Sequence, residues 1–369
     1  MSARANTIAQ GFSQKLMLET YDRDLVTEIV NRDYQGEINE VGSKLNILNF
    51  DRLSEKTYAG SALSADDLTE NNSQLTIDQY KSFYWKEKTL DNWLSYIKNP
   101  HPTIVKQVGE ERAKNMETFA LTFWPDVAAG NRVGTNETTG TVTVANSTGV
   151  VTGSGTSFTA GMVDKPFKAT GHTKWYRVKT YTSSTQITIE DDKDDATSAY
   201  TGGAIGAGAT YIIQANTAVQ VTTANLLQKV SDLKLALDKA EANSKSNVPD
   251  SDRILIVPPE FEYNLVRATG IVLHVPEAYQ ELVKKGFVTM LQGFKVFRSN
   301  RLAGNNTDGY HCLAMHRNWL TFAEKVLDAR MEEDLPGDFG TAYKDLFVYG
   351  GKVTDARRHF AAEGFFTFA

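Results

Sequence analysis

The segment between residues 134 and 214 differs sharply in composition from the chain on either side of it. From Gly134 to Ala215 lie eleven of the 27 glycines, eighteen threonines and one proline, Pro166. Short runs of β-forming residues separated by turns rich in Gly, Asn, Ser and Asp are typical of a sandwich or small barrel. The sequence therefore predicts a small all-β module, immunoglobulin-like or a small barrel, at 134–214. Its four clearest strand runs lie at 141–144, 175–178, 186–189 and 210–213.

The residues before and after this module favour helices. Thr103 can cap a long amphipathic helix, because apolar residues recur at helical spacing after it. Thr223 can cap a second helix, in which apolar residues from Leu226 to Leu237 follow the 3.6-residue period. We expect both helices to pack one face into a core.

Strands alternate with further helices after residue 250. The apolar run at 253–257 predicts a strand that ends at two consecutive prolines, and a helix follows at 260–267. Another helix is expected at 277–285 and another strand at 294–297. Helices and strands thus follow one another in irregular order, which predicts the α+β class.

Residues 41–86 predict a long β-hairpin. One strand candidate lies at 45–50, and the other begins at 75 and continues through 83–85, with a polar stretch between them. An isolated two-stranded ribbon is only marginally stable in water. We therefore expect this hairpin to gain its burial from a neighbouring molecule.

Composition and charge exclude several classes of protein. Lys and Arg number 39 against 45 Asp and Glu, a net charge of −6, which is the wrong sign for tight general binding to nucleic acid. No stretch approaches the roughly 18 apolar residues of a membrane span. The N-terminus lacks the apolar block of a secretory signal, and the one cysteine, Cys312, cannot form an internal disulfide. We expect folding in a reducing cytoplasm.

Catalytic and metal-binding motifs are absent from the sequence, so we expect no enzyme, no cofactor and no metal. The glycine-rich run at 202–208 precedes a strand pattern rather than a helix, which excludes a phosphate-binding loop. His311 and His316 flank Cys312 on an expected strand, where an odd separation sends the two histidines to opposite faces. A buried structural cysteine is favoured over a zinc site. The acidic run at 190–195 lacks the register of a calcium loop and is interpreted as a solvated turn.

An ordered series of segments resembles the major capsid protein of tailed bacteriophages, with the Hong Kong 97-type fold. The segments that carry the resemblance are 27–34 (TEIVNRDY), 41–47 (VGSKLNI), 75–81 (LTIDQYK), the helix from Thr103, 254–261 (ILIVPPEF), 291–300 (LQGFKVFRSN), 311–324 and 349–353 (YGGKV). No single segment is decisive, but their order and spacing are specific. Residues 134–214 depart from the minimal family pattern and resemble an inserted module.

The resemblance implies a division of the chain into six parts. These are an N-terminal arm (1–40), an extended hairpin loop (41–86), a peripheral domain with a long spine helix (87–133), the inserted module (134–214), an axial domain (215–344) and a return to the peripheral domain (345–369). The inserted module could decorate the shell, bind host surfaces, or brace neighbouring capsomers.

The resemblance also implies a function in assembly rather than catalysis. Copies of the protein are expected to associate as pentamers and hexamers into an icosahedral virion head that encloses double-stranded DNA without sequence-specific binding. Assembly would take place in the host bacterial cytoplasm, with scaffolding, portal and cement or decoration proteins as partners and no membrane. The alternative is a phage tail or adhesion protein with a receptor-binding β module, which predicts tubes or fibres.

Charged residues at two places are candidates for contacts between subunits. The hairpin carries Glu55, Lys56, Asp66, Asp67 and Glu70 on its polar stretch. Arg357 and Arg358 carry the opposite charge in a segment that the resemblance places near a subunit boundary. We therefore predict that Asp66 and Asp67 pair with these two arginines of a neighbouring copy.

Overall fold

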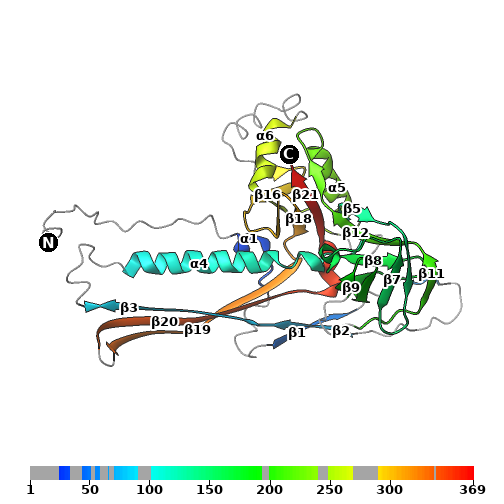
Figure 1. Cartoon of the computed structure of the whole chain (residues 1–369). Helices are drawn as coiled ribbons and strands as arrows, with labels where there is room; N and C mark the ends of the chain where they lie inside the picture. The colour runs from blue at the N-terminus through cyan, green and yellow to red at the C-terminus, as the bar shows by residue number, and fades with distance from the viewer. Residues whose placement is uncertain are drawn as a thin grey trace, which may run out of the picture.

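The computed structural model describes residues 25–33, 44–50, 55–58, 65, 70–89, 101–192, 199–239, 248–268, 290–335 and 338–369. The fold mixes helices with four sheets, so the α+β prediction is confirmed. Figure 1 shows three parts: a central sheet with its helices, a long arm of strands beside a helix, and a separate eight-stranded unit at the other end of that helix.

The central sheet lies at the core of the molecule. Its strand order is β13-β21-β18-β14-β16-β15, and its most buried strands, β14 and β18, are apolar along most of their length. The strands are β13 (Val219–Val221), β14 (Arg253–Val257), β15 (Met290–Leu291), β16 (Phe294–Arg298), β18 (Gly309–His316) and β21 (Ala361–Phe368), with the short β17 (Gly304–Asn305) paired to β18. Helices α5 (Leu226–Asp238) and α6 (Pro259–Arg267) contribute side chains to the same core.

Most of the local predictions for this region are confirmed. The strand at 253–257 ends at Pro258, and α6 begins at Pro259, where a missing backbone N–H costs no helical hydrogen bond. The predicted buried face of α5 is buried at Leu226, Val230, Leu233 and Leu237. The predicted caps are wrong: α5 begins after Asn225 rather than Thr223. The predicted helix at 277–285 lies outside the described residues.

A long three-stranded ribbon forms the arm of the molecule. Its order is β19-β20-β3, with β19 (Leu320–Leu335) and β20 (Asp338–Val353) forming an antiparallel hairpin and β3 (Gln79–Lys88) added along β20. Helix α4 (His101–Leu121) runs alongside the ribbon (Figure 1). It starts before Thr103, so the predicted cap is wrong here too. The short helix α1 (Val26–Ile29) packs against α4.

The hairpin expected at 41–86 divides between two sheets. Strand β1 (Lys44–Phe50) pairs with β2 (Glu70–Thr76), whereas β3 belongs to the ribbon. Leu45, Ile47 and Leu75 are buried in one cluster with Ala323 and Val348 of the ribbon. The expectation that the hairpin buries little within its own chain is therefore wrong for its base.

The boundary expected between residues 344 and 345 falls inside β20. Strand β19, which lies in the expected axial domain, pairs with β20 in the ribbon. The end of the chain, β21, returns to the central sheet rather than to the ribbon. The sequence pattern concealed β19 because charged residues interrupt it at Glu324, Lys325 and Asp328.

Residues 135–217 form an eight-stranded unit with its own core. Its sheet order is β11-β6-β7-β10-β9-β8-β12-β5, and one cluster of buried apolar residues lies within it. Tyr176 is buried there. The strands are β5 (Thr135–Glu137), β6 (Thr141–Val144), β7 (Val150–Ser154), β8 (Pro166–Ala169), β9 (Tyr176–Ser183), β10 (Gln186–Asp191), β11 (Ile205–Ala209) and β12 (Tyr211–Thr217), with the 3-10 helix η3 (Ala160–Met162) between β7 and β8.

The chain enters and leaves this unit along one edge of β21. The entering strand β4 (Arg132–Val133) pairs in parallel with β21 at Glu363 and Gly364, and the leaving strand β13 pairs with it at residues 366–368. The two connections nearly touch, because a Cβ on Gly134 would lie 2.8 Å from the Cα of Ala215. Two 3-10 helices, η2 (Trp124–Asp126) and η5 (Asp355–Phe360), lie beside this junction.

Candidate assembly surface and charged junction

The ribbon exposes large apolar side chains on both of its faces. Its register places Tyr84, Lys344 and Arg330 in one row, and the next row holds Trp85, Tyr343 and Met331 on the opposite face. A strand alternates its side chains between faces, so each row belongs to one face. The exposed apolar residues of the ribbon are Tyr80, Tyr84, Val326, Leu327, Met331, Phe339 and Leu346. Such a concentration marks an interaction surface, since monomeric proteins rarely leave extended apolar patches open.

A groove of about 450 Å³ lies between α4 and the ribbon. Val105 and Val108 of α4 form one wall, and Trp85 stacks on Tyr343 at 5.0 Å between ring centroids on the other. Arg112 reaches from α4 toward the ribbon, where it pairs with Asp345 and lies 4.9 Å from the ring centroid of Phe347. The charge of this arginine is thus neutralised within the chain, which leaves the groove mostly apolar.

The structure describes three of the five predicted contact residues of the hairpin. Glu55 and Lys56 are exposed, and Glu70 opens strand β2 opposite Phe50. Asp66 and Asp67 lie outside the described residues.

The two predicted arginines differ in their surroundings. Arg357 is half-buried and donates through Nη1 to the carbonyl oxygen of Asn318 at 3.1 Å. Arg358 is buried and donates from Nη2 to the Asp192 carboxylate at 2.6 Å, from Nη1 to the Asp192 carbonyl at 2.8 Å, and from Nε to the Asp126 carbonyl at 3.0 Å. Burial alone would lower the pKa of Arg358, but the Asp192 carboxylate outweighs it and holds the pKa above its ordinary value. The guanidinium of Arg358 is therefore committed to partners in its own chain.

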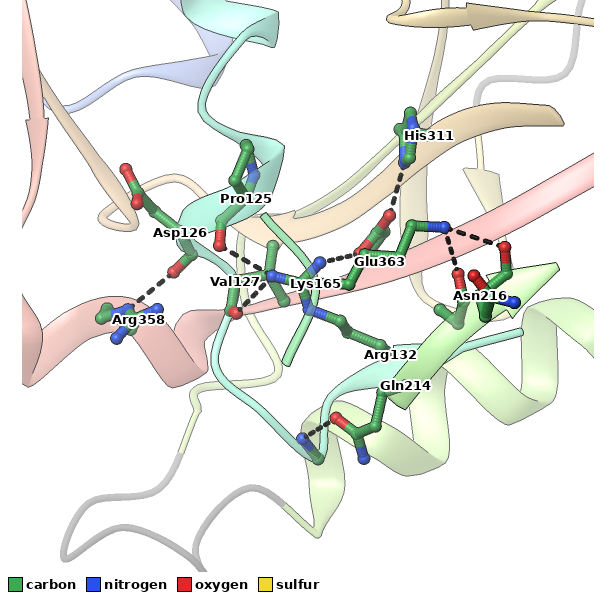
Figure 2. Close-up of polar contacts among 12 residues, drawn as sticks. Pro125, Asp126, Val127, Arg132, Lys165, Gln214, Asn216, His311, Arg358 and Glu363 are labelled. Atoms are coloured by element: carbon green, nitrogen blue, oxygen red, sulfur yellow. Dashed lines mark hydrogen bonds and ion pairs between the residues drawn. The ribbon is translucent and has the colours of Figure 1, made fainter. Parts of the chain in front are cut away.

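A buried carboxylate, Glu363 of β21, forms the centre of the junction (Figure 2). One carboxylate oxygen accepts from Nη1 of Arg132 at 2.6 Å, and the other lies 2.5 Å from Nδ1 of His311. Burial would raise the pKa of Glu363, but the Arg132 guanidinium, the hydrogen bond to His311 and the charge of Lys165 together lower the pKa below the usual value. The His311 ring is stacked between Trp124 at 3.6 Å and Phe365 at 4.6 Å between ring centroids.

Lys165 of the eight-stranded unit points into the same region. Its Nζ donates to the carbonyl oxygens of Ala215 at 2.6 Å and Asn216 at 3.0 Å (Figure 2). It also lies 4.1 Å from the ring centroid of Phe365, a cation–π contact with the central sheet. Burial lowers the pKa of Lys165 to about 8.

The solvated turn predicted for the acidic run at 190–195 is wrong for its first two residues. Glu190 and Asp191 are buried rather than solvated. Glu190 accepts from Arg177 at 3.0 Å, and Asp191 accepts from Lys174 at 2.7 Å. Strand β10 runs through both residues, and both partners lie on nearby parts of the same unit. Strand alternation could not have revealed that both are buried, because Ile189, Glu190 and Asp191 are buried in succession.

Three comparisons with known proteins, two of sequence and one of structure, bear on the family of this chain. A model of the phage capsid protein family matches residues 169–362, more than half of the chain. The chain belongs to the phage capsid protein family. The match runs from the end of β8 through the central sheet and the ribbon into β21, so it includes part of the eight-stranded unit. A search of curated proteins by sequence finds no match.

Solved phage structures share the fold of this capsid protein over nearly its whole length. The structure titled Mycobacterium phage Che8 is 18% identical, with a TM-score of 0.59 and 98% of both chains covered. The capsid of Ralstonia phage GP4 is 10% identical, with a TM-score of 0.58 and 99% and 97% covered. The capsid of cyanophage P-SCSP1u is 15% identical, with a TM-score of 0.57 and 98% and 94% covered. These structural neighbours agree with the family model, which identifies the chain as a phage capsid protein.

Among the described residues, no group of three or more His, Cys, Asp or Glu side chains could hold a metal ion. Cys312 is fully buried between β14 and β21, as predicted for a structural cysteine. In the same described part of the chain, no helix has the length and apolar character needed to span a membrane.

Proposed function

We propose that this capsid protein assembles, as pentamers and hexamers with the Hong Kong 97-type fold, into an icosahedral head that encloses double-stranded DNA. The proposal rests on the exposure of apolar side chains on both faces of the ribbon, which extends away from the central sheet (Figure 1). Contact with other copies would remove this surface from water. Closed symmetry then joins many such contacts at high effective concentration, so each one can be individually weak.

The net charge of −6 supports a container rather than a nucleic-acid-binding shell. A wall without excess positive charge encloses DNA without trapping it on its surface, because tight nonspecific binding depends on neutralised phosphates. We propose that assembly occurs in the host bacterial cytoplasm with scaffolding, portal and decoration proteins.

The parts of the fold suggest distinct roles in the proposed shell. We propose that residues 1–40 form an arm and that the 41–86 segment reaches a neighbouring subunit through its outer part, while α4 serves as the spine helix. The eight-stranded unit, close to the expected module at 134–214, would be an insertion exposed on the shell surface.

Electron microscopy of ribbon variants tests the proposed assembly. Tyr84→Lys combined with Met331→Lys places a charge on each face of the ribbon, at side chains that are 57% and 55% exposed. We expect closed shells from the wild-type chain and a folded protein without shells from this variant. The matched control is Tyr181→Lys, a 39% exposed tyrosine on the eight-stranded unit, which should still form shells.

Two outcomes would contradict the proposed assembly, and a third would contradict the proposed exposure of the eight-stranded unit. Normal shells from the double ribbon variant would show that the exposed surface is not a contact. Loss of shells in the Tyr181 control would contradict the proposed exposure of the eight-stranded unit. Tubes or fibres from the wild-type chain would favour a tail or adhesion protein.

The charged candidates refine the proposed contacts between subunits. Arg357 fits the predicted partner of Asp66 and Asp67 better than Arg358, whose guanidinium is already paired within the chain. We propose that Glu55, Lys56 and Glu70 contribute to the same contact. Changing Asp66 and Asp67 together to lysine should impair shell formation, and Arg357→Glu should restore it. Unimpaired shells from the two-lysine variant would refute the pairing.

A further inference from the structure

Two short connections alone would let the eight-stranded unit rotate relative to the central sheet. The chain enters through β4 and leaves through β13, and these strands form only two and three residue pairs with β21. Such short ladders contribute few backbone hydrogen bonds. Side chains must therefore decide whether the unit keeps one orientation.

An ion pair joins Arg358 to Asp192 across the junction. Arg358 belongs to η5 beside the central sheet, whereas Asp192 directly follows β10 of the unit. Their side chains are 8% and 10% exposed, and the guanidinium makes three hydrogen bonds, two of them to Asp192. Separating such a pair would leave two charges without partners in a poorly hydrated region, which is strongly unfavourable.

Asp126 of η2 supplies a second charged contact to the unit. Its carboxylate lies 3.7 Å from Nη1 of Arg177 on β9, and Arg177 also binds Glu190 on β10. Burial raises the pKa of Asp126, while Arg358 and Arg177 act in the opposite direction. Arg177 therefore links two strands of the unit to the helix that follows α4.

Two further contacts lie on the other side of the junction. Lys165 of the unit lies against Phe365 of β21, as described above. The side chain of Gln214 in β12 accepts from the backbone N–H of Gly130 at 2.8 Å (Figure 2). The contacts thus lie around the connections rather than at one point, and each of them limits rotation of the unit.

We infer that the eight-stranded unit and the central sheet form one rigid body, locked by the Arg358–Asp192 pair, the Asp126–Arg177 pair and the Lys165–Phe365 contact. The lock sets the direction in which the unit projects within a single chain, before any contact with another copy. The unit then keeps one orientation relative to the central sheet and is not flexibly linked to it. This inference goes beyond the proposed shell assembly and does not depend on it.

Pulsed electron spin resonance measures this rigidity directly. Spin labels at Thr180→Cys on β9 and Leu235→Cys on α5, two exposed positions, report the distance between the unit and the central body. Cys312 is fully buried, so the native chain adds no label. Labelled full-length chain is diluted into unlabelled chain, so that only distances within one chain are read, whether or not shells form.

The lock predicts a single narrow distance distribution in the otherwise wild-type chain. Arg358→Gln should at least double its width, because Asp192 loses its partner across the junction. The matched control is Arg357→Gln, its neighbour in η5, which bonds to Asn318 of the body and should leave the width unchanged. Circular dichroism of each variant checks that the chain remains folded.

Two results would overturn the lock. A broad or multiple distribution in the chain with native junction residues would show that the unit is not held, whatever the variants do. An Arg358→Gln distribution as narrow as that of the control would show that the Arg358–Asp192 pair does not hold it. If Arg358→Gln does not fold, Asp192→Asn takes its place with the same expected broadening.

Discussion

Replacing Glu363 with glutamine should destabilise the chain strongly, although the two side chains have nearly the same shape. The Glu363 carboxylate and the Arg132 guanidinium are each 1% exposed and lie 2.6 Å apart. Glutamine removes the negative charge and leaves Arg132 buried and unpaired. Breaking a buried pair from one side costs about 3–5 kcal/mol. We take the lower end, about 3 kcal/mol, because Arg132 keeps the carbonyls of Pro125 and Val127 as acceptors.

Thermal unfolding followed by circular dichroism measures this loss on unassembled chain at one concentration, since assembly itself raises the midpoint. A loss of about 3 kcal/mol corresponds to a fall of roughly 4 °C in the midpoint of a chain of 369 residues, because the entropy of unfolding is about 2.1 cal/mol/K per residue. The matched control is Glu262→Gln. Its carboxylate pairs at 3.2 Å with Arg298, which is 52% exposed, and such a surface pair contributes under about 1 kcal/mol.

The loss should also depend on pH with a defined sign. Because Arg132 lowers the pKa of Glu363, the folded chain binds this proton less readily than the unfolded chain, whose value is near 4.5. The stabilisation is complete above that value and disappears as pH falls through the pKa of the folded state. The unfolding midpoints of the wild type and of Glu363→Gln should therefore converge at acidic pH. A midpoint change no larger than that of Glu262→Gln at pH 7 would refute the reasoning.

Three further predictions concern other parts of the fold. Gly134→Leu should lower the free energy of unfolding by about 1–3 kcal/mol, because the added side chain overpacks against Ala215. Gly203→Leu, where a Cβ would meet no atom within 4 Å, should not, and thermal unfolding of both variants checks this. Cys312 should resist maleimide at pH 7.5 in the native chain and react fully in denaturant, as read by mass spectrometry, because burial raises the pKa of its thiol and blocks access. The lowered pKa of Lys165 should make the wild type more stable by up to about 3 kcal/mol as pH rises from 8 to 10.5. Lys165→Met should abolish this rise, as measured by urea unfolding across that pH range. An equal rise in the variant would contradict the prediction.

Local patterns predicted elements wherever neighbouring residues decide the structure. The helical period from Leu226 to Leu237 was sufficient for α5, and the proline pair after Val257 was sufficient to end β14. Helix starts were less predictable. Threonine is a common cap, but α4 and α5 both begin elsewhere, since tertiary packing of their apolar faces outweighs a cap of about 1 kcal/mol.

The junction could not be predicted because its partners are far apart in the sequence. Arg358 pairs with Asp192 across 166 positions, and Glu363 pairs with Arg132 across 231. A charged residue gives no local sign of burial when its counterion comes from another sheet. The buried Glu190 illustrates the same difficulty, because a cluster of charges is more often solvated than buried.

The adjacent residues Arg357 and Arg358 indicate how a shell protein can separate folding from assembly. Arg358 is buried in an ion pair with Asp192 across the junction. This pair therefore stabilises the fold of a single chain. Arg357 bonds only to a carbonyl oxygen in the contacts described above and remains partly exposed. The same separation holds at larger scale, since the charges of the junction are buried inside the chain whereas the apolar residues of the ribbon are exposed. Contacts of the first kind fix the shape of a subunit before assembly, and contacts of the second kind become favourable only when a second subunit arrives.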